Sequence, residues 1–260
     1  MDTIDSDQLR QSTWVRHVEH WAEIDSTNDY AIKVLREIPA DRLPALVVAD
    51  TQTAGRGRGA NRWWMAAGGL PFSVIVEPTD DAAAQASGLS LAVGLAVARG
   101  LQEFVEPSRV QLKWPNDVYV DERKVSGVLV EQPAGKPVRW VIGVGINVNN
   151  SIADAPDELR QRAVSLSDAT GRPHSRQQVL CRVLDQLQRH LDWLSIGAHQ
   201  LADDWRELCL LTGKWVELDV YGGRVSGYCE GIDDEGGLLL RTAAGPQRFV
   251  GGVVAHFTRR

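Results

Sequence analysis

Short apolar runs recur through the first 150 residues of the chain and predict buried strands. Residues 46–49 (LVVA), 72–77 (FSVIVE) and 141–148 (VIGVGINV) are runs of this kind. Residues 15–24 (VRHVEHWAEI) alternate more loosely between apolar and polar and are a candidate first strand.

Helical spacing of apolar residues marks three other segments. Residues 85–104 place their larger apolar side chains on one stripe, with small residues elsewhere, which predicts a buried packing helix. Residues 176–194 carry a continuous stripe of leucine and valine, and residues 201–211 predict a further helix.

A run of helix-capping residue types precedes another helical pattern. Residues 25–29 read DSTND, and apolar residues recur at helical spacing just after them, so a helix should begin here. Capping alone could explain Ser26, Thr27 and Asn28. One residue is enough for a cap, however, so the other two are available to contact a ligand.

The pattern changes after residue 212, where short strands alternate with glycine-rich turns. About 48 residues of this kind predict a small β barrel. The expected division is therefore a large domain at 1–211 and a small one at 212–260. The expected strands are KWVELDV, RVSGYCEGI, GLLLRT and QRFVGGVV.

Composition narrows the class of protein. The net charge of −6 argues against a general nucleic-acid coat, which needs a clustered excess of basic residues. Cys181, Cys209 and Cys229 lie too far apart for a zinc motif or a disulfide framework. The polar, acidic N-terminus lacks the features of a signal peptide, and no apolar run has the length of a membrane span. A cytoplasmic protein is expected.

The loop at residues 50–64, DTQTAGRGRGANRWW, is the least core-like stretch. Its three alternating glycines permit close backbone approach and unusual dihedral angles. Arg56 and Arg58 add forked donors suited to a phosphate or a carboxylate. By itself the loop is either an anion-binding turn or a flexible, solvated hairpin, and it matches neither a P-loop nor a dinucleotide fingerprint.

A hairpin around the turn DERK carries a second set of candidate groups. Pro115 blocks ladder pairing, so it should bend the backbone and project Asn116 and Asp117 sideways. The hairpin would bring Lys113 close to Lys124, with a carboxylate between them in sequence. Only five of the 28 basic residues are lysine, which favours a specific use for these two.

Glycines interrupt two of the expected strands. An exposed turn is the commonest role for a lysine such as Lys124, but Gly127 follows it inside a strand, where glycine usually marks close approach by a ligand or another backbone. Gly143 and Gly145 likewise lie inside an expected strand, which ends near the polar Asn147. Together they predict a groove floored by backbone.

These motifs, taken in order, resemble those of bacterial biotin protein ligases. The likeness rests on GRGR with a following tryptophan, on KWPND, on K-x-x-G after a hairpin, on GxGIN and on a terminal barrel, and it covers the chain from about Ser26 to its end. It implies a mixed α/β (α+β class) catalytic domain similar to class II aminoacyl-tRNA synthetases and an SH3-like C-terminal domain.

The resemblance also implies an activity. Such enzymes use ATP and Mg²⁺ to convert biotin to biotinyl-5′-AMP, and then transfer biotin to one lysine of the biotin carboxyl carrier domain of a carboxylase. A monomer or a weak, ligand-dependent homodimer is expected, with no membrane partner.

Site residues follow from the resemblance position by position. It implies biotin-binding roles for Ser26, Thr27, Asn28, Gln52, Arg56, Gly57, Arg58, Lys124 and Gly127. It implies ATP-binding roles for Trp63, Lys113, Asn116 and Asn147. Lys124, Arg56 and Arg58 would be catalytic, and Asp117 is a candidate metal ligand.

Two departures from the family pattern stand out. Many members read GRGRRGR in the loop, whereas Gly59-Ala60-Asn61-Arg62 follows Arg58 here, so part of the positive charge is missing or displaced to Arg62. Only 25 residues precede Ser26, too few for the helix-turn-helix domain of regulatory members. The form without that domain is expected, which would not bind operator DNA.

Two alternatives remain at this point. A lipoate protein ligase has a similar fold and also forms an acyl-adenylate, although KWPND and GRGR favour biotin. A catalytically silent small-molecule sensor or nucleic-acid-binding relative would also explain the loop and the barrel.

Overall fold

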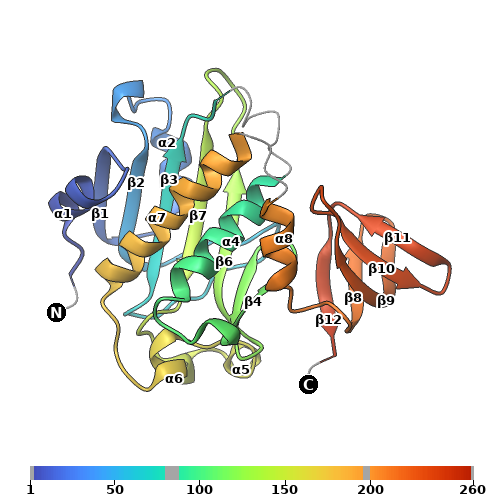
Figure 1. Ribbon diagram of the computed structural model, residues 1–260. Helices are drawn as coiled ribbons and strands as arrows, with labels where there is room; N and C mark the ends of the chain where they lie inside the picture. Colours follow the sequence, from blue (N-terminus) through green and yellow to red (C-terminus); the bar gives the residue numbers. More distant parts are fainter. Residues whose placement is uncertain (1–2, 80–87, 196–199, 259–260) are drawn as a thin grey trace.

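A computed structural model describes residues 3–79, 88–195 and 200–258. It contains a large mixed sheet with helices on both faces and a smaller antiparallel sheet beside it (Figure 1). The large sheet has the order β1-β2-β3-β7-β6-β5-β4, in which only β1 and β2 pair in parallel. Its strands are β1 (His17–Ile24), β2 (Ala45–Gln52), β3 (Leu70–Val76), β4 (Val110–Lys113), β5 (Asp117–Val120), β6 (Arg123–Glu131) and β7 (Trp140–Ile146).

Helices α4 and α7 pack against each other over one face of this sheet (Figure 1). Every residue of α4 except two is buried, because its small side chains let it lie flat between the sheet and α7. The α-helices are α1 (Ser6–Ser12), α2 (Thr27–Val34), α4 (Leu89–Leu101), α5 (Asp157–Arg160), α6 (Leu166–Thr170), α7 (Arg176–Ser195) and α8 (Gln200–Glu207). Three-residue 3₁₀ turns are η1 (Ala40–Arg42), η3 (Pro107–Arg109) and η4 (Ile152–Asp154).

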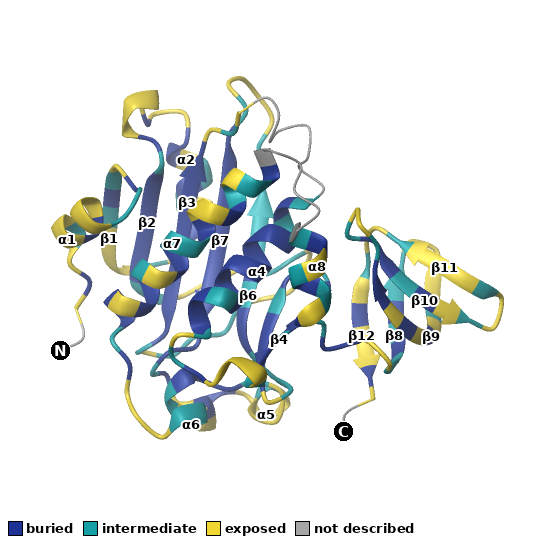
Figure 2. Ribbon diagram, in the orientation of Figure 1, coloured by how far each residue is buried: buried dark blue, intermediate teal, exposed yellow. Residues whose placement is uncertain are grey.

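The smaller sheet has the order β11-β10-β9-β8-β12 and follows α8. Its strands are β8 (Trp215–Val220), β9 (Gly223–Ile232), β10 (Leu238–Thr242), β11 (Gly245–Phe249) and β12 (Val253–Phe257). Figure 2 shows that β11 and its flanking turns are largely exposed, whereas the inner strands bury alternate side chains. The larger domain meets this sheet through Trp114, whose Nε1 donates to the carbonyl of Gly236 at 3.0 Å, and through Arg206, whose Nε donates to Ile232 O at 2.8 Å.

The expected fold class is confirmed, and the predicted strands of the large sheet are all present. The segment QRFVGGVV was wrong as one strand: β11 ends at Phe249 and β12 begins at Val253, because two successive glycines break the ladder between opposite edges of the small sheet. The helix expected at 201–211 ends at Glu207, since the following backbone pairs with β4 instead. Of the helix expected at 85–104, residues 85–87 lie outside the described part of the chain, and α4 ends at Leu101.

Candidate active site

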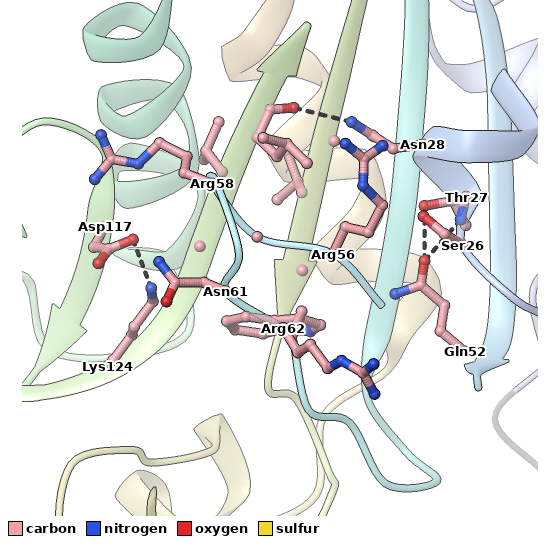
Figure 3. A pocket seen from close by; sticks show the side chains of 18 of the residues that line it. Ser26, Thr27, Asn28, Gln52, Arg56, Arg58, Asn61, Arg62, Asp117 and Lys124 are labelled. Atoms are coloured by element: carbon pink, nitrogen blue, oxygen red, sulfur yellow. Dashed lines mark hydrogen bonds and ion pairs between the residues drawn. The ribbon is translucent and has the colours of Figure 1, made fainter. Parts of the chain in front are cut away.

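One cavity of about 250 Å³ collects most of the predicted site residues (Figure 3). Its walls come from the start of α2, the end of β2, the loop between β2 and β3, the β4–β5 hairpin, β6, β7 and the start of β12. In Figure 3 Ser26, Thr27 and Gln52 lie on one side, and the Lys124–Asp117 pair lies on the other. The cavity therefore has a neutral end and a cationic end.

At the neutral end Ser26, Thr27 and Asn28 are buried and Gln52 is partly buried, and several of their hydrogen bonds are made within the group. Ser26 is the N-cap of α2, and its hydroxyl accepts a hydrogen bond from the amide of Asp29 at 3.3 Å. Thr27 and Asn28 are therefore not needed to cap the helix. Gln52 Oε1 accepts from Thr27 N at 2.7 Å and from Thr27 Oγ1 at 3.1 Å. Capping thus explains one of the three polar residues that precede the helix.

Ser73 supports this end from below. It is fully buried on β3, and its hydroxyl lies 2.9 Å from Thr27 Oγ1 and 2.6 Å from Asn28 Oδ1. Ser73 was not among the predicted site residues. The available signal was a hydroxyl in the middle of an otherwise apolar run, which must find a hydrogen-bond partner when buried.

The glycines of β6 and β7 form the floor of the cavity. Gly127 lies opposite Gly145 in the ladder, and a Cβ added at Gly145 would lie 2.5 Å from the indole of Trp63. A Cβ at Gly143 would collide with the amide of Asn28. The predicted backbone floor is therefore present, and side chains already approach it closely.

The cationic end centres on Lys124. Its Nζ lies 2.7 Å from Asp117 Oδ1 and 5.7 Å from the ring centre of Trp63. Arg58, from the loop, lies on the same side of the cavity, whereas the side chain of Arg62 extends toward the side of Gln52 (Figure 3). The hairpin of β5 and β6 thus places a lysine and a carboxylate together.

Lys113 joins the cationic end to the small sheet. Its Nζ donates to Val254 O at 2.9 Å and lies 5.6 Å from the ring centre of Phe257. Burial lowers the pKa of Lys113 to about 8, and Asp117 opposes that shift. Val253 and Val254 of β12 also line the cavity, which no signal in the sequence indicated.

The arginine loop folds as a small hairpin. Gly57 N donates to Asn61 O and Trp63 N donates to Gly55 O, both at 2.9 Å. The Arg56 side chain forms ion pairs with Asp29 and Glu131. Hydrogen bonding to Glu131 is the main cause of the raised pKa of Arg56.

Two predicted residues do not line the cavity. Asn116 is buried and donates to Val128 O at 3.0 Å, while its Oδ1 has no protein partner. Asn147 is also buried, donates to Val164 O at 3.3 Å and accepts from Asn150. The other predicted site residues all line it: Ser26, Thr27, Asn28, Gln52, Arg56, Gly57, Arg58, Trp63, Lys113, Asp117, Lys124 and Gly127.

Asp117 is the one acidic side chain among the described residues of the cavity wall. In the described ranges no cluster of three or more metal-binding side chains occurs. Mg²⁺ that accompanies a nucleotide is held largely by phosphate oxygens and water, with one or two protein carboxylates. The site therefore fits a magnesium ion delivered with a triphosphate, to which Asp117 could contribute one ligand.

The fold and the site define a class of protein. Hydroxyl and amide groups suit a small, neutral, polar ring, and the nearby cations suit a carboxylate beside a phosphate. This combination is that of a ligase that activates a carboxylic acid with a nucleotide.

Comparison with known proteins narrows that class. Residues 22–147 match the Biotin/lipoate A/B protein ligase family, and residues 208–256 match the Biotin protein ligase C terminal domain. The chain belongs to the biotin protein ligase family.

Individual relatives cover nearly the whole chain. It is 37% identical to the bifunctional ligase/repressor BirA of Bacillus subtilis over 93% of this chain and 74% of that protein. It is 33% identical to the biotin–[acetyl-CoA-carboxylase] ligase of Paracoccus denitrificans over 87% of this chain and 95% of that one. The structure of Aquifex aeolicus biotin protein ligase in complex with biotin and ATP aligns with a TM-score of 0.78 and 33% identity, covering 94% of this chain and 99% of that one.

Across the described residues, no helix is both long enough and apolar enough to cross a membrane.

Proposed function

We propose that the protein is a biotin protein ligase that converts biotin and ATP to biotinyl-5′-AMP and then biotinylates a carrier-domain lysine of a biotin-dependent carboxylase. The observation that carries this proposal is that one cavity joins two different ends. Thr27 and Gln52, which are hydrogen-bonded to each other, form the neutral end, and Lys124 and Arg58 form the cationic end. A neutral ring and a carboxylate of one ligand would reach the two ends together.

The neutral end would bind the ureido ring of biotin. Ser26, Thr27, Asn28 and Gln52 supply hydroxyl and amide groups for it, and Gly127 and Gly57 let the ligand approach the backbone. Ser73 fixes the orientation of Thr27 and Asn28 from beneath. A pocket that is ordered before binding avoids the entropy cost of arranging these groups.

The cationic end would perform the first chemical step. The biotin carboxylate attacks the α-phosphorus of ATP, a P–O bond forms, and the bond to the leaving pyrophosphate breaks. Negative charge on the phosphoryl oxygens increases along this path, so fixed cations stabilise the transition state most. Lys124 would contact both the carboxylate and the phosphate, and Arg58 and Lys113, which line the same cavity, would add positive charge.

The remaining contacts serve the nucleotide and the second step. Trp63, beside Lys124, would offer a flat surface for the adenine. Asp117 would help to hold the Mg²⁺ that accompanies ATP, and the ion would offset phosphate charge. Asn116 and Asn147 act indirectly, by holding β6 and the segment after β7 in place. In the second step the amine of the carrier lysine attacks the mixed anhydride, forms an amide and releases AMP.

Exchange of labelled pyrophosphate into ATP tests the first step directly. Exchange should require biotin and Mg²⁺, should stop on addition of EDTA, and should not occur with lipoate. Exchange with lipoate but not with biotin would contradict the assignment. Transfer is then tested by incubating the protein with biotin, ATP and an isolated carrier domain, and locating the added biotin by mass spectrometry.

A further inference from the structure

Arg56 ties the arginine loop to both neighbouring walls of the cavity. Its Nη2 donates to Glu131 Oε1 at 2.9 Å and its Nη1 to Glu131 Oε2 at 3.2 Å, while Nη1 also pairs with Asp29. Glu131 ends β6, and Asp29 lies in the first turn of α2. A bidentate arginine–carboxylate contact is strongly directional, so it restricts the positions that the loop can adopt.

Glu131 has a second partner at the neutral end of the cavity. Asn28 donates from Nδ2 to Glu131 Oε2 at 2.9 Å and to Leu129 O at 3.3 Å. The hydroxyl of Ser73 lies 2.6 Å from the other end of the same amide. One carboxylate therefore holds a loop arginine and orients a residue of the neutral end.

The charges divide the loop arginines into two kinds. Two carboxylates offset the charge of Arg56, so an incoming anion would have to displace them to reach it. Arg58 lines the cavity on the side of Lys124 and has the greater attraction for an anion. Arg56 is thus better placed to fix the loop than to bind phosphate.

We propose that Glu131 is a positioning residue that clips the loop at residues 55–63 to the sheet through Arg56 and orients Asn28 toward the ligand. Its effect on biotin rests on the proposed function, whereas the clip itself does not. Removing the carboxylate should release the loop and, separately, free the amide of Asn28.

Limited proteolysis without ligand tests the clip. The loop contains three trypsin sites, at Arg56, Arg58 and Arg62, and Trp63 offers a chymotrypsin site. Glu131→Gln should speed cleavage by both proteases about fivefold, the change expected from losing an ion pair that is partly screened by solvent. Mass spectrometry identifies the cut bonds, and a thermal melt verifies that each variant folds.

A matched control removes a carboxylate from a comparable arginine elsewhere. Asp219 pairs with Arg224 on the surface of the small sheet, so Asp219→Asn should leave cleavage of the loop unchanged. Wild-type cleavage rates in Glu131→Gln, or equal acceleration in Asp219→Asn, would overturn the clip.

A second pair of variants separates the two partners of Glu131. Glu131→Gln loses the charge that holds Arg56 but keeps an amide oxygen that can accept from Asn28, whereas Glu131→Ala loses both. The KM for biotin in pyrophosphate exchange should be roughly fivefold higher in the alanine variant than in the glutamine variant, with kcat within about twofold. Equal KM values would overturn the orienting role, and absence of exchange in the wild type would instead count against the proposed function.

Discussion

The neutral and the cationic ends of the cavity are built on different parts of the molecule. Thr27, Gln52 and Ser73 belong to the start of a helix and two neighbouring strands, and their polar atoms satisfy one another. Lys113 and Lys124 belong to the antiparallel strands β4 and β6, which flank β5, and the surrounding groups come from a glycine-rich loop and from the edge of the small sheet. One end is set by the central sheet, and the other is assembled from three separate pieces.

This difference matches the chemistry that each end would perform. A neutral ring is recognised best by donors and acceptors that are already in place, because their reorganisation would reduce affinity. An adenylate must be enclosed during reaction and then exposed to an amine, which favours charges carried by parts that can move. Substitutions at the two ends should therefore have different effects.

The largest effect is expected at the cationic end. Lys124→Ala should reduce the rate of biotin-dependent pyrophosphate exchange by about 10²-fold or more, because a charge beside the phosphoryl oxygens is removed. Lys136→Ala, at an exposed position away from the cavity, is the control. A near-normal rate in Lys124→Ala would make this residue an ordinary turn lysine and remove the basis for calling that end catalytic.

The buried charge of Lys113 predicts a pH dependence of stability. Its folded pKa of about 8 lies below the unfolded value of 10.5, so between these pH values the unfolded chain holds a proton that the folded chain has lost. Folded stability should therefore rise with pH in this window, relative to Lys113→Met, by on the order of 2 kcal/mol. Urea unfolding of both proteins near pH 7.5 and 10 measures the difference, and parallel changes would show that Lys113 is not desolvated beneath β12.

At the neutral end, Ser73→Ala should raise the KM for biotin about tenfold with little change in kcat, since Thr27 and Asn28 lose the hydroxyl that orients them. Ser126→Ala is a matched control, because Ser126 is equally buried on β6, two strands away from β3 in the same sheet, and its hydroxyl has no protein partner. A similar KM in both variants would mean that the neutral end is not held from below.

The smallest effect is expected for Arg62→Ala, which removes the displaced charge at the end of the loop. Arg62 lines the cavity but lies farther along the loop than Arg58, so the adenylate should escape only about threefold faster, as expected for a solvent-screened contact. Release of labelled adenylate from a preformed complex measures this rate. An effect as large as that of Lys124→Ala on exchange would place Arg62 among the principal cations.

Local sequence accounts for much of the site. The capping residues before α2, the bend at Pro115 and the glycines of β6 and β7 act within their own segments, and each is where the pattern indicated. Local sequence does not account for the positions of Asn116 and Asn147. Both stand in recognisable motifs, yet their amides face backbone carbonyls of neighbouring segments.

The sequence by itself determined which side chains are the candidates for chemistry: two lysines, the loop arginines and the polar run at the start of a helix. Only the tertiary structure decided their partners. Arg56 meets Glu131 across 75 positions, and Lys113 meets Val254 across 141, because sheet order and domain packing bring them together. A hydrogen bond or an ion pair requires a few ångströms of separation, and over such sequence distances only the folded chain sets that separation.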